Sequence, residues 1–243
     1  MSRSVGLLAL AAGLLVAGTG VVAAQSLNLD FGEGATTGRL VQFVVLLTVL
    51  SLAPSIIVMV TSFTRIVVVL AFLRSALGTQ QTPPNTVLVS LVLFLTAFVM
   101  APTLQTSYTE GIAPLVAQEI DEVTAFERGM APVHRFMIEH VREQDLRLFM
   151  DMAEVEGVEA PEDTPLRALV PAFMISELRR AFEIGFLLFV PFVIFDMVVA
   201  SILMSMGMMM LPPIMISLPF KLIFFVLVDG WYLVAGSLVQ SFG

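Results

Sequence analysis

The chain has 243 residues, of which 58% are hydrophobic and 13% are charged, and its mean hydropathy is +0.95. Soluble domains have about 45–50% apolar and about 25% charged residues, so this composition predicts an integral membrane protein. The formal charge of −8 argues against a nucleic-acid partner, and the absence of cysteine excludes thiol chemistry and cysteine-bound metals.

The first 24 residues have the pattern of a secretory signal peptide. Arg3 supplies a short positive region, residues 5–16 form an apolar core too short to span a bilayer, and Val22-Ala23-Ala24 resembles a cleavage site. We therefore expect the mature chain to begin near Gln25, outside the cytoplasm, with a periplasmic linker over residues 25–39. An uncleaved first span is the alternative.

Residues 40–104 are predicted to form a first membrane hairpin with apolar segments at about 40–60 and 86–104. At 1.5 Å per residue the first segment covers the roughly 30 Å hydrocarbon core. Arg65 and Arg74 have no acidic neighbours, and the positive-inside rule places their loop in the cytoplasm. The apolar stretch after Arg65 either lies along the membrane interface or folds into a hairpin buried in protein.

Residues 105–180 are richer in acidic residues, and their apolar residues become periodic, which predicts a helical periplasmic domain. Thr124 and Glu127 have the spacing of a capping box. Phe136 and Phe149 belong to an apolar stripe that packs either internally or against a neighbouring subunit. Glu177 lies at the foot of the next apolar segment, where we expect it to have a partner.

Residues 181–243 are predicted to form a second membrane hairpin with apolar segments at about 182–204 and 214–236. Between these segments lies a cluster of methionines, and a methionine side chain is flexible and polarizable enough to adapt to many shapes. The cluster either fills gaps between packed helices or forms a soft seal. The candidate sealing residues are Met206, Met208, Met209 and Met210.

Ionisable groups within apolar segments are costly and are usually paired or functional. This chain has four candidates: Arg65, Asp196, Lys221 and Asp229. Asp196 and Asp229 are nearly equidistant from Pro212, so an antiparallel hairpin would place them at similar depth. One hypothesis is an intramembrane aspartyl protease, but Asp229 lacks a preceding Gly-x-Gly. Structural pairing between helices or subunits fits the residues better.

Other chemistry is not supported by the sequence. There is no glycine-rich loop ending in Lys-Ser or Lys-Thr that would bind phosphates. His134 and His140 are six residues apart, which places them on different faces of a helix and not in the i, i+4 spacing of metal ligands. We therefore predict no catalytic residue, no cofactor and no metal site.

Several motifs resemble those of the FliP family of flagellar export-gate proteins, and the resemblance extends from about residue 40 to 242. The motifs are Thr61-Ser62-Phe63-Thr64-Arg65, Leu73-Arg74-Ser75-Ala76-Leu77-Gly78-Thr79, Pro83-Pro84-Asn85, Ser176-Glu177-Leu178, Phe186, Pro191-Phe192, Asp196, Gly207-Met208-Met209-Met210-Leu211-Pro212-Pro213, Leu218-Pro219-Phe220-Lys221 and Asp229-Gly230-Trp231.

The resemblance implies an all-α membrane protein built of kinked hairpins that assembles into a ring with FliQ, FliR and other export-apparatus membrane subunits. It also implies a location at the flagellar basal body in the bacterial inner membrane, with a substantial periplasmic portion. Unfolded substrate chains would pass through the ring, and the methionine turn would act as a gasket at its constriction. Virulence secretion systems use a close homologue, which remains an alternative; the signal peptide favours the flagellar branch.

Overall fold

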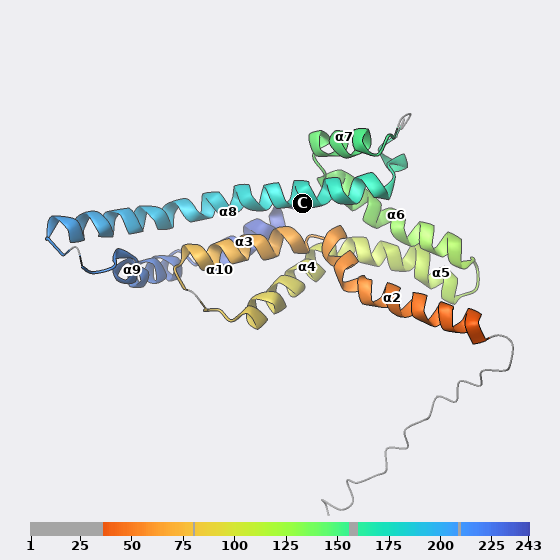
Figure 1. Cartoon of the computed structure of the whole chain (residues 1–243), viewed down its shortest axis with the longest axis horizontal. Coiled ribbons are helices and arrows are strands. Elements are labelled where there is room, and N and C mark those ends of the chain that lie inside the picture. Colours follow the sequence, from red (N-terminus) through yellow and green to blue (C-terminus); the bar gives the residue numbers. More distant parts are fainter. Residues whose placement is uncertain (1–35, 80, 156–159, 209) are drawn as a thin grey trace, which may run out of the picture. The chain divides into compact units, whose positions relative to one another are not determined.

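The structure is a computed structural model that describes residues 36–79, 81–155, 160–208 and 210–243. Every regular element in these ranges is helical, and three helices are long and apolar enough to cross a membrane (Figure 1). The predicted class, an all-α membrane protein, is therefore confirmed. The predicted signal peptide, nearly all of the linker and Met209 lie outside the described residues.

The chain divides into two units, residues 1–50 and 51–243. The described part of the first unit is the beginning of α2 (Thr36–Val60), whose side chains at positions 41–48 and 50 are exposed. The exposed side chains of this part of α2 are nearly all apolar, and they occur on every face of the helix. Such a helix needs either lipid or another protein around it.

The core of the second unit forms where α3 (Phe63–Ala76), α4 (Asn85–Ser107) and α8 (Leu166–Ser205) meet. Ile66, Val69 and Leu73 on one face of α3 are almost completely buried. At Gly185 of α8, an added Cβ would lie 2.5 Å from the Phe72 ring, so only glycine allows this close approach. One face of the stretch after Arg65 is thus buried in protein.

Helix α8 runs without interruption for 40 residues through Pro171 and Pro191. The predicted third segment, 182–204, covers only its second half. Similarly, α4 continues through a π-helical turn η1 (Tyr108–Ile112) into α5 (Ala113–Val116). The predicted boundaries near residues 104 and 180 thus follow a change in polarity and do not coincide with helix ends.

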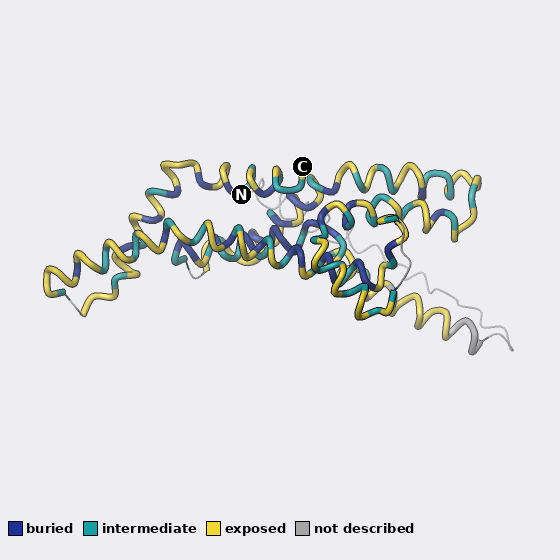
Figure 2. The backbone as a smooth tube through the Cα atoms, turned by 90° about the horizontal axis from the view of Figure 1, so that it is seen from above, coloured by how far each residue is buried: buried dark blue, intermediate teal, exposed yellow. Residues whose placement is uncertain are grey.

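The polar insertion contains α6 (Glu122–His140), α7 (Glu143–Met152) and a 3-10 turn η2 (Pro161–Asp163). Helix α6 begins before the predicted capping box, because Asp121 occupies the N-cap. The Thr124 hydroxyl donates to the Asp121 carboxylate and lowers the pKa of that carboxyl. Figure 2 shows buried residues concentrated where the helices of the second unit pack together, whereas the beginning of α2 is exposed throughout.

The last apolar segment is broken in two. Helix α9 (Pro213–Leu227) and α10 (Gly230–Gln240) meet at an angle of 64°. Asp229 lies at the break with a φ of 52°, a left-handed conformation that asparagine and aspartate tolerate better than most residues. The predicted apolar segment over 214–236 thus consists of two helices that are together apolar enough to span a membrane, and the bend between them lies at Asp229.

Candidate functional site

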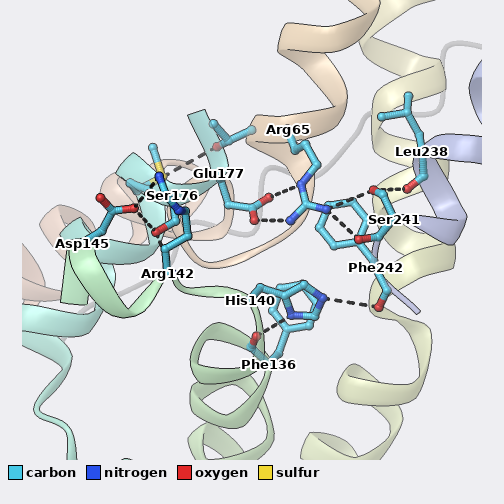
Figure 3. Close-up of polar contacts among 12 residues, drawn as sticks. Arg65, Phe136, His140, Arg142, Asp145, Ser176, Glu177, Leu238, Ser241 and Phe242 are labelled. Atoms are coloured by element: carbon cyan, nitrogen blue, oxygen red, sulfur yellow. Dashed lines mark hydrogen bonds and ion pairs between the residues drawn. The ribbon is translucent and has the colours of Figure 1, made fainter. Parts of the chain in front are cut away.

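A buried ion pair joins α3 to α8 at the centre of the second unit (Figure 3). Arg65 Nε donates to Glu177 Oε2 at 2.9 Å, and Arg65 Nη2 donates to the other carboxylate oxygen. Both side chains are almost inaccessible to solvent. The paired, planar geometry suits arginine specifically, because a guanidinium presents two parallel N–H groups to a carboxylate.

The remaining donors of Arg65 reach the residues after α10. Arg65 Nη1 donates to the Ser241 carbonyl at 2.9 Å and to the Ser241 hydroxyl at 3.0 Å. The guanidinium carbon also lies 3.7 Å from the centroid of the Phe242 ring, within cation–π range. Arg65 therefore contacts two distant parts of the chain, which lie 112 and 176 residues further along the sequence.

Phe136 is a second buried aromatic residue that contacts the Phe242 ring. It is buried in a cluster with Met100, Leu169 and Phe173, and its ring stacks on Phe242 with centroids 6.2 Å apart. His140, one turn further along α6, has Nδ1 2.8 Å from the Phe136 carbonyl and Nε2 3.3 Å from the Phe242 carbonyl. The structure thus joins the predicted residues Arg65, Phe136 and Glu177 in one region.

Phe149 is separate from that region. It lies on α7, which is fastened to α8 through Ser176: the Ser176 hydroxyl donates to Asp145 Oδ2 at 2.7 Å, and the Arg142 amide donates to the Ser176 hydroxyl at 3.0 Å. Phe149 is half-buried, and α7 has no fully buried residue. Its ring therefore keeps a surface that another chain can cover.

A second ion pair joins α8 to α9. Lys221 Nζ donates to Asp196 Oδ2 at 2.6 Å and to the Ala76 carbonyl at 3.2 Å, so it also satisfies the last carbonyl of α3. The Ser217 hydroxyl donates to the other oxygen of Asp196. Lys221 is buried, whereas the Asp196 side chain keeps 31% of its surface exposed.

This pairing differs from the expectation that Asp196 and Asp229 lie at the same depth. The turn between α8 and α9 takes up residues 206–212, so its midpoint is near residue 209 and not at Pro212. Asp196 is nine residues before the end of α8, and Lys221 is eight residues after the start of α9. Asp229 lies beyond the end of α9 and is exposed. Among the described residues, no contact joins the two acids.

The methionine turn, residues 204–213, ends α8 with a glycine in the left-handed region. Gly207 has a φ of 73°, its amide donates to the Met204 carbonyl, and the Met208 amide donates to the Leu203 carbonyl. These two bonds form the Schellman motif that terminates many helices. Met204, Met206 and Met210 are exposed and Met208 is half-buried, so the described methionines of the turn do not form a packed core.

Ser217, Ser241 and Phe242 complete these sites and were not predicted. The two residues after α10 lie beyond the last predicted apolar segment and carry no charge. One signal was available: a buried guanidinium has five N–H donors, more than a single carboxylate satisfies, so Arg65 required a second acceptor. The sequence does not say which residue supplies it. In the described part of the chain, no three His, Asp or Glu side chains form a metal-binding group.

Comparison with known proteins gives consistent results. Residues 46–238 match the sequence profile of the FliP family. The chain is 62% identical to the flagellar biosynthetic protein FliP of Caulobacter vibrioides, over 91% of this chain and 84% of that protein. It is 55% identical to the Bacillus subtilis protein of the same name, over 83% and 91%. For the Aquifex aeolicus protein, the identity is 47% over 94% and 97%.

The profile match covers most of the described helices, including both ion pairs and the methionine turn. The relatives match over most of their own length as well as most of this chain. On this evidence the chain belongs to the FliP family.

Proposed function

We propose that the chain is a pore-forming core subunit of the flagellar type III protein export gate. In this function it passes unfolded flagellar substrates across the bacterial inner membrane while the flagellum is assembled. Membership of a family of flagellar biosynthetic proteins supports this, as do the three apolar helices long enough to cross a membrane.

The methionine turn is the observation that carries the pore-forming part of the proposal. Helices α8 and α9 meet at this turn at the left end of Figure 1, and Met210 is 98% exposed. Several copies of the turn would form a gasket from Met206, Met208, Met209 and Met210. Thioether chains repack around objects of different shape, so such a gasket would stop ions and still admit a polypeptide.

A ring of several copies with FliQ, FliR and other membrane subunits would cover the exposed apolar faces. Those faces carry many exposed large hydrophobic side chains, and exposed apolar patches mark interaction sites with protein or membrane. Phe149 would contact a neighbouring subunit directly. Phe136 and Glu177 are buried in their own chain, so they would support assembly by holding α3, α6 and α8 in the shape that the neighbour recognises.

The predicted topology completes the proposal. Residues 40–104 and 181–243 would form the two membrane hairpins and residues 105–180 the periplasmic portion, at the flagellar basal body. The chain would be a passive gate without catalytic activity, driven by partner proteins. N-terminal sequencing of the membrane-bound chain should begin near Gln25, and an intact Met1 would contradict the signal peptide.

Conductance tests the gasket. The triple variant Met206→Ala, Met208→Ala, Met210→Ala should assemble as wild type but conduct ions in planar bilayers. Replacing the same residues with leucine keeps most of the apolar bulk and is the matched control, which should seal better than the alanine variant. Wild-type conductance in an assembled alanine variant would show that the methionines do not form the seal.

A further inference from the structure

The sulfur chemistry of the chain is unusually simple. It contains 15 methionines and no cysteine, so every sulfur atom is a thioether. In many proteins a peroxide reacts first with a reactive cysteine thiolate, but this chain has no cysteine. Which methionines are oxidised then depends on which thioethers the oxidant reaches.

The described methionines differ widely in accessibility, and exposed ones also occur outside the turn: Met152 is 70% exposed, Met197 67% and Met215 65%. Met206 and Met210 in the turn are 64% and 98% exposed, whereas Met100 and Met137 in the core are 1% and 0% exposed. The backbone beside the turn is open as well, since a Cβ added to Gly207 would meet no atom within 4 Å. A small oxidant therefore reaches Met206 and Met210 in the turn more easily than half-buried Met208, and it does not reach Met100 or Met137 in the core.

We infer that the methionine turn is a reversible oxidation site, at which peroxides convert Met206, Met208 and Met210 to methionine sulfoxides. In the reaction, a sulfur lone pair attacks one peroxide oxygen, the O–O bond breaks and an S–O bond forms. After a proton shift, the second oxygen leaves as water. Each sulfur loses two electrons, and hydrogen peroxide gains them. A methionine sulfoxide reductase reverses the change by oxidising a dithiol to a disulfide and releasing water.

Oxidation would change the property on which the proposed gasket depends. A thioether is apolar and flexible, whereas a sulfoxide is polar and accepts hydrogen bonds from water. Several sulfoxides at one constriction would therefore hydrate it and let ions pass. This consequence rests on the proposed function, but the oxidation site itself rests only on the exposure of the turn.

Peptide mass spectrometry tests the site. The full chain in its assembled complex, placed in lipid nanodiscs, is treated briefly with dilute hydrogen peroxide. The turn should be oxidised on the order of tenfold faster than Met100 and Met137, whose sulfur atoms are buried. Met197 and Met215 are sharper comparators, because they are as exposed as Met206 in the single chain but lie on apolar helices that lipid or subunits should cover. Oxidation of Met137 or Met197 at the rate of the turn would overturn the inference.

Conductance then separates the consequence from the gasket. Peroxide should raise the conductance of the wild-type complex, and methionine sulfoxide reductase with dithiothreitol should restore it. The variant Met206→Leu, Met208→Leu, Met210→Leu should respond much less to peroxide than the wild type, because it keeps only Met209 of the four gasket methionines. If the wild-type turn is oxidised without a leak while the alanine variant leaks, oxidation does not control the gate. If neither leaks, the gasket itself is wrong.

Discussion

The Arg65 region and the methionine turn use opposite kinds of interaction. Around Arg65, specific donors and acceptors are buried together, and each has a partner at a defined position. At the turn, exposed thioethers have no such requirement. The first arrangement fails when one group is removed, whereas the second depends only on the amount and softness of apolar surface. Substitutions should therefore have large effects on stability in one region and small effects in the other.

The largest effect is expected for Glu177→Ala, because it leaves the Arg65 guanidinium buried without its carboxylate. Breaking a buried pair costs about 3–5 kcal/mol. Thermal unfolding in detergent should show a large decrease in Tm. The exposed pair of Arg179 and Glu183 offers a control, since Arg179→Ala should cost about 1 kcal/mol or less. Equal Tm values for the two variants would contradict the comparison.

The double variant Arg65→Met, Glu177→Leu sharpens this test. Removing both charges leaves no unpaired ion, so the double variant should be more stable than either single variant. If it is less stable than both, the hydrogen bonds of Arg65 to Ser241 contribute more than the ion pair does.

Phe136→Ala and Phe149→Ala should separate folding from assembly. Phe136 is buried, and its truncation should cost about 3–5 kcal/mol of the free energy of unfolding. Phe149 is half-buried, so its truncation should reduce the stability of the monomer less and the oligomer yield more. The free energy of subunit association should decrease by about 1–3 kcal/mol if Phe149 makes a packed contact with a neighbour. Tm and native mass spectrometry of both variants measure the difference. A normal oligomer yield for Phe149→Ala would show that α7 is not an interface.

An intermediate effect is expected at the second ion pair. Lys221→Met removes the partner of Asp196, but the Asp196 side chain is partly exposed and keeps the Ser217 hydroxyl. The cost should be about 1–3 kcal/mol, smaller than for Glu177→Ala. Asp196→Asn, which keeps hydrogen-bonding capacity, serves as the milder control. A larger loss for Lys221→Met than for Glu177→Ala would reverse the order proposed here.

The smallest effect on stability is expected at the methionine turn. Met206→Leu, Met208→Leu and Met210→Leu together should change the free energy of unfolding by less than about 1 kcal/mol, because the described side chains are exposed or half-buried and leucine has a similar volume. Thermal unfolding checks this directly. A decrease in Tm comparable to that of Lys221→Met would show that the turn is packed core after all.

The sequence predicted the helices well, because continuous apolar runs and one-faced stripes are local patterns. It also identified Arg65, Asp196, Lys221 and Glu177 as residues that need partners. It did not predict the pairs, since Arg65 and Glu177 are 112 residues apart and only the packing of α3 on α8 brings them together. The break at Asp229 was missed because a left-handed aspartate between two apolar helices leaves the apolar pattern unchanged. Ser241 was missed because a backbone carbonyl has no sequence signal.

Helix α8 contains Glu177 and leads without a break into the methionine turn, so a rotation of the helix about Glu177 would displace the turn. Glu177 and the last residue of α8, Ser205, are 28 residues apart, or about 42 Å along the helix axis. A tilt of α8 by about 5° around Glu177 would move Met206 by about 4 Å, more than the width of a water molecule. Gly185→Ala, which would push α8 away from Phe72, tests this and should alter conductance without touching the turn. The width of the channel at the methionine turn would then depend on how firmly Arg65, far from the turn, fixes the position of Glu177 on α8.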